Sequence, residues 1–283
     1  GSEMCIRDSR ELGWTIVEPE SGILACGDAG KGRMEEPARI ETAVKALLLA
    51  NRPDGELPLK GLAVLVTAGP TQEPLDPVRF LTNHSTGKMG YALAEQARDL
   101  GAQVTLVSGP VALDALYGVD VVNVTTAQDM FDAVTNRFAD TDITVMAAAV
   151  GDFRPVEQAR DKIKKNGRSS IELELTSNPD ILAWAGEHKR PDQTLCGFAM
   201  ETRDLEANAA KKLNGKHCDM LVANNLRTPG AGFAADTNVV TVLTPGETAD
   251  RPSIERWSKM GKDALAKRIL VKLAAMRADG ERR

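Results

Sequence analysis

Short apolar segments alternate with amphipathic helical segments through residues 61–149, and this alternation is the strongest constraint on the fold. The candidate strands are residues 61–67 (GLAVLVT), 103–108, 119–124 and 143–149. The candidate helices, with apolar side chains at helical spacing, are residues 86–100 and 127–138. We therefore predict an α/β fold: a doubly wound, mostly parallel, Rossmann-like sheet with helices on both faces.

The second half of the chain continues this alternation less regularly. Its candidate strands are residues 171–175, 194–199, 220–223 and 239–243. Its candidate helices are residues 179–188, residues 205–216 and a last helix with Leu265, Ile269, Leu273 and Met276 on one face. We expect Pro179 at the first helical position after the Asn178 turn, because proline is favoured there.

Composition shifts divide the 283-residue chain into three predicted parts. Residues 1–10 (GSEMCIRDSR) contain no apolar signal-peptide core, and we interpret them as a remnant of cloning or sequence assembly. Residues 11–60 combine glycine-rich turns, a short helix near residues 40–50 and the linker NRPDGELP. Residues 61–283 are the main predicted domain.

Charge, hydropathy and cysteine usage exclude several classes of function. The formal net charge of −5 and the lack of a dense basic stripe argue against nucleic acid as a main partner. No apolar run approaches the roughly 18 residues of a membrane span, so we expect a soluble protein without a membrane partner. The four cysteines form no CxxC pair or metal-ligand cluster, which favours a reducing, cytoplasmic location.

Residues 67–90 (TAGPTQEPLDPVRFLTNHSTGKMG) connect the first strand to the first helix and are the most informative segment. In open α/β sheets ligands bind beyond the carboxyl ends of strands, and helix N-termini attract anions. This loop therefore favours phosphate or carboxylate binding. It is not a P-loop, since Met89 follows Gly87-Lys88, and no GxGxxG fingerprint is present, which disfavours a nicotinamide-dependent oxidoreductase.

Polar residues near the predicted strand ends each allow two interpretations. Asn83 could donate to a developing oxyanion or close an Asx-turn. Asp152, after the strand that ends in Ala147 and Ala148, could bind a ribose or base, or only end the strand. Lys162 opens the run KIKK, which is either a solvated loop or a loop that closes over a triphosphate.

Two features of the second half are equally ambiguous. Lys212 and Lys216 lie four residues apart on one helical face, where like charges repel unless an anion or an acid lies between them. They form either a solvated face or a phosphate clamp. Phe198 could be a platform for a base or a core residue. These residues alone indicate an α/β protein with an anion crevice and do not name its chemistry.

Six segments together resemble one known family: TAGPTQEPLDPVRFLTNHSTGKMG, AAAVGDFRP, DKIKK, SNPDIL, GFAMET and FAADTN. Their order and spacing, from about residue 61 to 273, are similar to the phosphopantothenate–cysteine ligase domain of the bacterial bifunctional coenzyme A biosynthesis proteins. The upstream segment PESGILACGDAGKGRMEEP resembles the end of their partner domain, a flavin-dependent phosphopantothenoylcysteine decarboxylase.

The resemblance implies a two-step ligation of 4′-phosphopantothenate with L-cysteine. CTP activates the carboxylate as an acyl-cytidylate with release of pyrophosphate, and the cysteine amine then displaces CMP to give phosphopantothenoylcysteine. It also implies Mg²⁺ that bridges phosphates, without ligands that we can name on the protein, and a homodimer formed by the ligase domain. Residue identities leave the preference for CTP over ATP open.

Family roles transfer to the matching positions of this chain. Asn83 would support the acyl-cytidylate and Lys162 would act in its conversion, so these are the predicted catalytic residues. The predicted nucleotide-binding residues are Ala147, Ala148, Asp152, Lys162, Asn178, Pro179, Asp180, Phe198, Lys212 and Lys216. A one-residue shift in the helix would select Lys211 instead of Lys212.

Cys26 matches the cysteine of the decarboxylase substrate flap, which is a proton donor in that family. The flavin-binding body of that domain would precede this segment, so we expect neither FMN binding nor decarboxylation by this chain alone. The alternative function is a non-catalytic, nucleotide-binding assembly module of the same protein.

Overall fold

The computed structural model describes residues 2–23, 29–50, 57–167, 169–201, 203–225, 235–248 and 251–280. It divides the chain into two compact units, Gly1–Pro53 and Asp54–Arg283. The division lies a few residues before the boundary predicted between residues 60 and 61. Cys26 lies outside the described residues. The interpretation of residues 11–60 as the end of a decarboxylase domain therefore stays a prediction.

The first unit contains two helices and one small sheet. Helix α1 spans Ser2–Glu11, helix α2 spans Pro37–Ala50, and strands β1 (Glu20–Ile23) and β2 (Ala29–Arg33) pair antiparallel. Helix α1 occupies nearly all of residues 1–10, and the interpretation of these residues as a remnant of cloning or sequence assembly stays a prediction. The helix expected near residues 40–50 is present as α2 and begins earlier, at Pro37.

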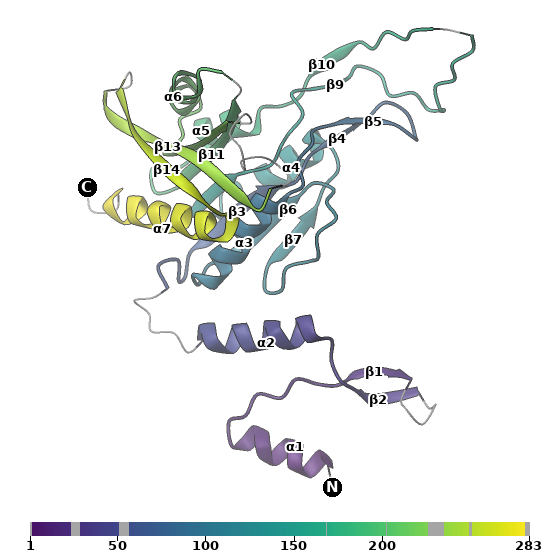
Figure 1. Ribbon diagram of the computed structural model, residues 1–283, viewed down its shortest axis with the longest axis vertical. Helices are drawn as coiled ribbons and strands as arrows, with labels where there is room; N and C mark the ends of the chain where they lie inside the picture. The colour runs from purple at the N-terminus through teal and green to yellow at the C-terminus, as the bar shows by residue number, and fades with distance from the viewer. Residues whose placement is uncertain are drawn as a thin grey trace. The chain divides into compact units, whose positions relative to one another are not determined.

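The second unit is built on an eight-stranded sheet with the order β14-β13-β12-β11-β8-β3-β6-β7 (Figure 1). Its strands are β3 (Ala63–Ala68), β6 (Gln103–Ser108), β7 (Asp120–Asn123), β8 (Ile143–Met146), β11 (Thr194–Glu201), β12 (Met220–Asn225), β13 (Thr237–Thr248) and β14 (Arg251–Gly261). The strands from β7 to β12 are parallel, and β13 and β14 add an antiparallel edge. In chain order the parallel strands lie 3-2-1-4-5-6, which confirms the predicted doubly wound fold.

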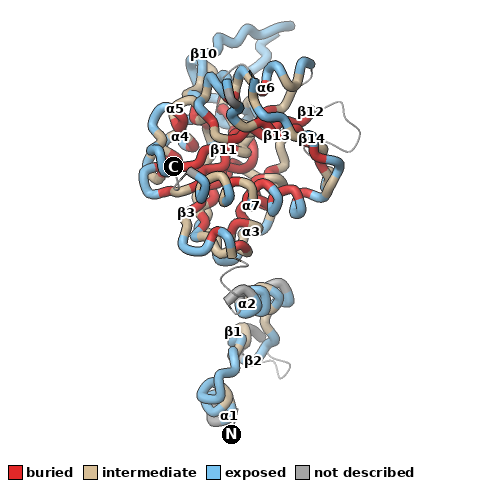
Figure 2. Tube along the Cα trace, turned by 90° about the vertical axis from the view of Figure 1, so that its left-hand side faces the viewer, coloured by how far each residue is buried: buried red, intermediate tan, exposed pale blue. Residues whose placement is uncertain are grey.

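Helices cover both faces of this sheet. The helices are α3 (Lys88–Asp99), α4 (Ala127–Phe138), α5 (Ile181–His188), α6 (Leu205–Gly215) and α7 (Lys262–Gly280). Val64 and Val66 of β3 pack with α3 and α7 in one apolar core, whereas Leu65 packs with α4, α5 and α6 in the other. Figure 2 shows this buried layer in red between the exposed outer surfaces of the helices. The alternation of β3 side chains between two cores is what a sheet buried on both faces requires.

Two short strand pairs extend from the carboxyl edge of the sheet (Figure 1). Strand β4 (Gln72–Pro74) pairs antiparallel with β5 (Phe80–Thr82), and β9 (Phe153–Pro155) pairs antiparallel with β10 (Leu175–Ser177). The predicted strand at residues 171–175 is wrong, since only Leu175 belongs to a strand. Its alternating apolar side chains Ile171 and Leu173 have no sheet to pack on and are exposed.

The start of α5 also differs from the prediction. Asp180 is the N-cap, and its side chain accepts a hydrogen bond from the Ala183 amide at 2.9 Å. Pro179 therefore lies before the cap and not at the first helical position. An aspartate is a strong N-cap and proline is tolerated on either side of the boundary, so the cap chemistry decides the helix start.

Candidate functional site

The candidate site lies where β3 and β8 end side by side. The chain leaves β3 toward β6 on one side of the sheet, while β8 begins the half that extends to the other side, so this is the topological switch point. Backbone contacts continue the ladder beyond the strands: the Ala149 amide donates to the Gly69 carbonyl at 2.8 Å, and the Thr71 amide donates to the Ala149 carbonyl at 3.3 Å. The two loops thus form one rigid rim.

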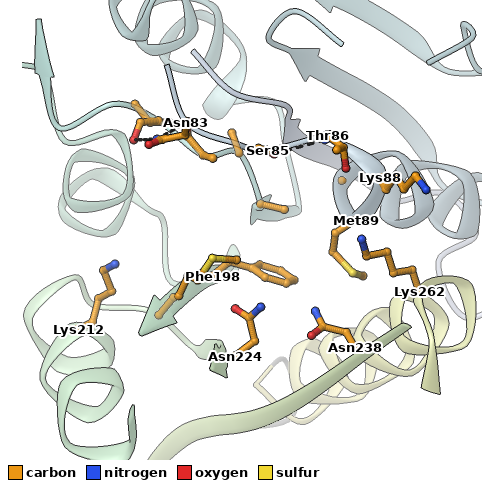
Figure 3. Close-up of a pocket in the computed structure, with 18 residues that line it drawn as sticks. Asn83, Ser85, Thr86, Lys88, Met89, Phe198, Lys212, Asn224, Asn238 and Lys262 are labelled. Carbon is orange, nitrogen blue, oxygen red and sulfur yellow. Dashed lines mark hydrogen bonds between the residues drawn. The ribbon is translucent and has the colours of Figure 1, made fainter. Parts of the chain in front are cut away.

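A cavity of about 400 Å³ opens at this rim (Figure 3). It is lined by the loop before α3, the first turn of α3, the residues after β8, and side chains from β11, β12, α6, β13 and the start of α7. The lining residues are Asn83, Ser85, Thr86, Gly87, Lys88, Met89, Gly90, Ala147, Ala148, Ala149, Val150, Phe198, Ala199, Met200, Lys212, Asn224, Asn238 and Lys262.

The N-terminus of α3 forms one wall of the cavity. Its N-cap is Gly87, whose φ of 78° is left-handed, and no side chain caps the helix. A Cβ atom at Gly90 would lie 2.4 Å from the Ala68 Cβ, so only glycine lets the first turn pack this closely on β3. The first turn contains no acidic residue. The helix dipole and backbone amides therefore favour an anion here.

Asn83 links the two loops of the rim. Its Nδ2 group donates to the carbonyl oxygens of Ala149 at 3.1 Å and Val150 at 3.2 Å. Among the described residues no side-chain bond closes an Asx-turn at Asn83, so the interpretation as a simple turn residue is wrong. Both amide hydrogens are used on the rim, which leaves Oδ1 as the atom available to accept a hydrogen bond from a ligand.

Two lysines beside α3 have different surroundings. Lys88 points away from the cavity in Figure 3, and its Nζ lies 2.6 Å from Asp236 Oδ1, whose pKa this contact lowers. Lys262 begins α7, is only 7% exposed, and points into the cavity. Burial and the charge of Lys88 lower the pKa of Lys262, while Asp236 acts in the opposite direction. An anionic ligand would therefore stabilise the Lys262 ammonium.

Asn224 and Asn238 supply a polar floor to the cavity. Both side chains are 6% exposed and point inward in Figure 3. The Asn238 Oδ1 accepts from the Val239 amide at 3.0 Å, and Asn224 lines the cavity from the end of β12. Sequence reasoning missed both asparagines and Lys262, because their local sequence resembles ordinary strand ends and a helix start.

Several predicted nucleotide-binding residues meet in this cavity. Ala147 and Ala148 line it at the end of β8, and Phe198 lies at its centre in Figure 3 while also packing against the core. Lys212 enters from α6, on the opposite side of the cavity from Lys262. Lys211 is exposed and is not a lining residue, so the geometry favours Lys212 over the one-residue shift.

Other predicted residues lie beyond the cavity lining and connect its surroundings. The Asn178 Nδ2 donates to the Gly151 carbonyl at 2.8 Å, and the Asn178 amide donates to the Asp152 carbonyl at 2.9 Å. These bonds fix the loop after β8 to the turn before α5, where Pro179 precedes the cap. The Asp152 side chain is exposed. Asp180 forms an ion pair with Lys216.

Lys162 is not a lining residue of this cavity. It lies exposed on the loop between β9 and β10, which has no regular secondary structure at this point. Of the two predicted catalytic residues, Asn83 therefore lines the cavity and Lys162 does not. The described residues contain no cluster of three or more His, Cys, Asp or Glu side chains suited to a metal ion, and none of their helices is long and apolar enough to span a membrane.

The family model that matches this chain describes the DNA/pantothenate metabolism flavoprotein C-terminal domain, or DFP, and the match covers residues 59–276. The chain belongs to this family. The DFP match includes the whole eight-stranded sheet and every lining residue of the cavity.

Relatives of this DFP domain include a protein of the predicted family and one with a different name. The Coenzyme A biosynthesis bifunctional protein CoaBC of Bacillus subtilis (strain 168) is 49% identical over 232 residues, which cover 82% of this chain and 56% of that protein. A cysteine/cysteine sulfinic acid decarboxylase of an unknown prokaryotic organism is 42% identical over 253 residues, covering 89% of this chain and 70% of that protein. The chain thus spans little more than half the length of the CoaBC relative.

A solved structure extends the agreement to three dimensions. The crystal structure of the C-terminal domain of CoaBC is 39% identical to this DFP domain, with a TM-score of 0.65, and the similarity covers 79% of this chain and 99% of that one. The fold and the resemblance to the ligase domain of CoaBC are thereby confirmed.

Proposed function

We propose that this chain is the phosphopantothenate–cysteine ligase of coenzyme A biosynthesis and that it uses CTP. The observation that supports the proposal most is that one cavity combines the uncapped α3 N-terminus, Asn83, Phe198 and Lys212. A ligase of this type needs a site for charged phosphates and a platform for a base beside the carboxylate to be activated. Membership of the DFP family and the similarity to a CoaBC protein of coenzyme A biosynthesis also support the proposal.

The two ends of the cavity would bind different parts of the substrates. Phe198 and Lys212 would hold the cytidine nucleotide, together with the small side chains of Ala147 and Ala148, which let it approach the backbone. The α3 N-terminus and Lys262 lie on the other side and would bind the phosphate of 4′-phosphopantothenate. The carboxylate would then lie between them, near the rim that Asn83 holds.

The reaction proceeds in two steps in this proposal. An oxygen of the 4′-phosphopantothenate carboxylate attacks the α-phosphorus of CTP, pyrophosphate leaves, and an acyl-cytidylate forms. The amine of L-cysteine then attacks the acyl carbon, CMP leaves with the bridging oxygen, and the amine loses a proton. Asn83 would hold the acyl-cytidylate through Oδ1 and the rim, and Lys162 would act on the intermediate once its loop reaches the substrate.

Mg²⁺ is part of the proposal as the partner of CTP. It would neutralise charge on the phosphates, and its ligands would be chiefly phosphate oxygens and water, because magnesium binds few protein carboxylates at nucleotide sites.

We also propose that the ligase acts as a homodimer. Apolar side chains are exposed along the two strand pairs that extend from the sheet and along the loop that joins β9 to β10: Val78, Phe80, Phe153, Val156, Ile171, Leu173 and Leu175. Exposed apolar groups gathered on projecting strands are typical of a protein–protein interface. A second copy of the chain would cover them.

Pyrophosphate release tests the proposed activity directly. The protein is incubated with CTP, Mg²⁺ and 4′-phosphopantothenate, with and without L-cysteine, and the series is repeated with ATP. Release with CTP, followed by CMP and amide when cysteine is added, is the expected result. Stabilisation by CTP without any release would support the non-catalytic binding module instead.

The decarboxylase named among the relatives defines a separate control. The same protein is incubated with L-cysteine or cysteine sulfinic acid alone, and carbon dioxide is measured. We expect none above the buffer. Release of carbon dioxide at a rate comparable to amide formation would contradict the assignment of this chain to ligation alone.

A further inference from the structure

The loop that contains Lys162 is fixed at one point by Asp76. Residues 160–167 have no regular secondary structure and nearly all are exposed. Yet the Ile163 amide donates to Asp76 Oδ2 at 3.0 Å, and the Ile163 carbonyl accepts from Arg79 Nη2 at 2.6 Å. Nearby, the Ala159 amide donates to the Leu75 carbonyl at 3.0 Å. The residue that follows Lys162 is thus held through both of its backbone polar groups.

Asp76 is itself held by its own turn. Its side chain is fully buried, and Oδ1 accepts from the amides of Val78 at 2.8 Å and Arg79 at 2.9 Å. Oδ2 accepts from Arg79 Nε at 3.0 Å as well as from Ile163. The hydrogen bond from Arg79 holds the pKa of this carboxyl well below its usual range, against the effect of burial. All four lone-pair directions of an ionised carboxylate are therefore in use.

The anchor is continuous with the rim of the cavity. Asp76 follows β4, which begins at Gln72 directly after Thr71. The Thr71 Oγ1 accepts from the Gly151 amide at 2.9 Å, so the rim and the start of β4 move together. A connected path of backbone and hydrogen bonds runs from the rim through Asp76 to the peptide that joins Lys162 to Ile163.

We infer that Asp76 is a positioning residue for Lys162, which it acts on through the Ile163 backbone; the inference rests on the proposed ligase function. The peptide group is planar, so a fixed Ile163 amide also fixes the carbonyl and the Cα of Lys162. The backbone of Lys162 is therefore held in a fixed position, from which its long side chain reaches toward the substrate. Misplacement of a reacting group by about 1 Å can cost roughly 100-fold in rate, which gives such an anchor catalytic value.

Asp76→Asn is the variant that tests the inference. The asparagine Oδ1 can still accept from the turn amides, but its Nδ2 cannot accept from Ile163 and faces the Arg79 guanidinium. We expect pyrophosphate release in the absence of cysteine to stay within about threefold of the native rate, while amide formation falls at least about tenfold and the acyl-cytidylate accumulates. Unchanged amide formation would overturn the inference.

A double variant separates positioning from a general structural role. In a Lys162→Ala background, Asp76→Asn should cause no further loss of amide formation, because the group that it positions is absent. An equal loss in both backgrounds would show that Asp76 acts without Lys162 and would overturn the inference. Asp142→Asn is the matched control, since Asp142 likewise accepts from a backbone amide, that of Ala63, and from an arginine, Arg277, at the opposite end of β8 from the cavity. It should leave the ratio of the two half-reactions unchanged.

Hydrogen exchange in the native protein tests the anchor even if Asp76→Asn does not fold. The Ile163 amide should exchange more slowly than the amides of Lys164 and Lys165 on the same exposed loop. Equal, rapid exchange of all three would refute the anchor. A native protein that releases no pyrophosphate would instead refute the proposed function, and the exchange result would still report on the anchor.

Discussion

The ammonium group of Lys216 binds the carboxylate of Asp180, the residue that caps helix α5. Lys216 is the C-cap of α6, so the pair joins the end of α6 to the start of α5, the helix that precedes it in the chain. Burial raises the pKa of Asp180, but the hydrogen bond from Lys216, the Ala183 amide and the charges of Lys216 and Lys212 lower it overall. The carboxylate of Asp180 therefore relieves the repulsion between the like charges of Lys212 and Lys216. Of these two lysines, Lys212 lines the cavity.

This arrangement predicts different effects for the two lysines. Lys212→Met should raise the KM for CTP about tenfold or more, because a charge-assisted hydrogen bond to phosphate or base is lost, and should leave the Tm unchanged. Lys216→Met should lower the Tm by about 1–3 °C, since a partly exposed ion pair contributes roughly 0.5–1 kcal/mol. Steady-state kinetics and thermal unfolding of both variants measure the contrast. Equal kinetic effects would favour a clamp formed by both lysines.

Removing the Asn83 side chain should abolish the link across the rim. We expect Asn83→Ala to reduce amide formation about 100-fold, because the rim carbonyls of Ala149 and Val150 lose their donor and the intermediate is displaced. Asn83→Asp should be no better, since its carboxylate would face both carbonyls. Asn136→Ala, an exposed change on α4, is the control. Native turnover by Asn83→Ala would show that Asn83 has no part in the reaction.

Lys262→Met should weaken binding of 4′-phosphopantothenate about 10–100-fold, in proportion to a lost charge-assisted hydrogen bond of roughly 1.5–3 kcal/mol. The KM for CTP should change little. Lys267→Met, an exposed lysine on the same helix, is the matched control for net charge. If the KM for CTP rises and that for 4′-phosphopantothenate does not, the assignment of the two ends of the cavity is reversed.

Acid unfolding should report on Asp76. Because its pKa is lowered from the ordinary 3.8 in the folded protein, its stabilisation is fully present above that value and is lost as the pH falls below it. The difference in Tm between the native protein and Asp76→Asn should therefore be constant near neutral pH and shrink below about pH 4. Thermal unfolding from about pH 2 to 7 measures it. A constant difference across the range would contradict the assigned ionisation.

Polar substitutions on the extended strand pairs should dissociate the proposed dimer. Phe80→Ser and Phe153→Ser each remove an exposed aromatic side chain, and we expect the double variant to sediment as a monomer without loss of Tm. Tyr117→Ser is the control, because Tyr117 is comparably exposed on a loop of the sheet domain. A native protein that sediments as a monomer would disprove the dimer.

Sequence pattern predicted the fold best where elements are buried on both sides. The strand at residues 103–108 and the helix at residues 127–138 match β6 and α4 in full, since apolar periodicity there reflects two packed cores. Strand β14 went unpredicted because its Arg251–Gly261 sequence is mostly polar and contains Pro252. It forms as an edge strand through pairing with β13, which local pattern does not report.

The candidate site was predicted in part for a related reason. Asn83, Ala147, Ala148, Phe198 and Lys212 lie in motifs or at strand ends, and the structure brings them to one cavity. Asn224, Asn238 and Lys262 were missed, because each is placed by the order of strands across the sheet and not by its neighbours in sequence. The antiparallel β13–β14 hairpin returns the chain so that α7 begins beside α3. Only the topology reveals this proximity.

The position of Lys262 has a consequence for synthesis of the chain. The cavity needs both the loop before α3 and the first residue of α7, which the ribosome adds only after all eight strands of the sheet. Domains fold as the chain emerges, so the earlier strands can assemble while the cavity still lacks its buried cation. A nascent chain would therefore lack the buried cation of the cavity until α7 has been synthesised, and the proposed binding of a phosphate-bearing substrate would be weak until then.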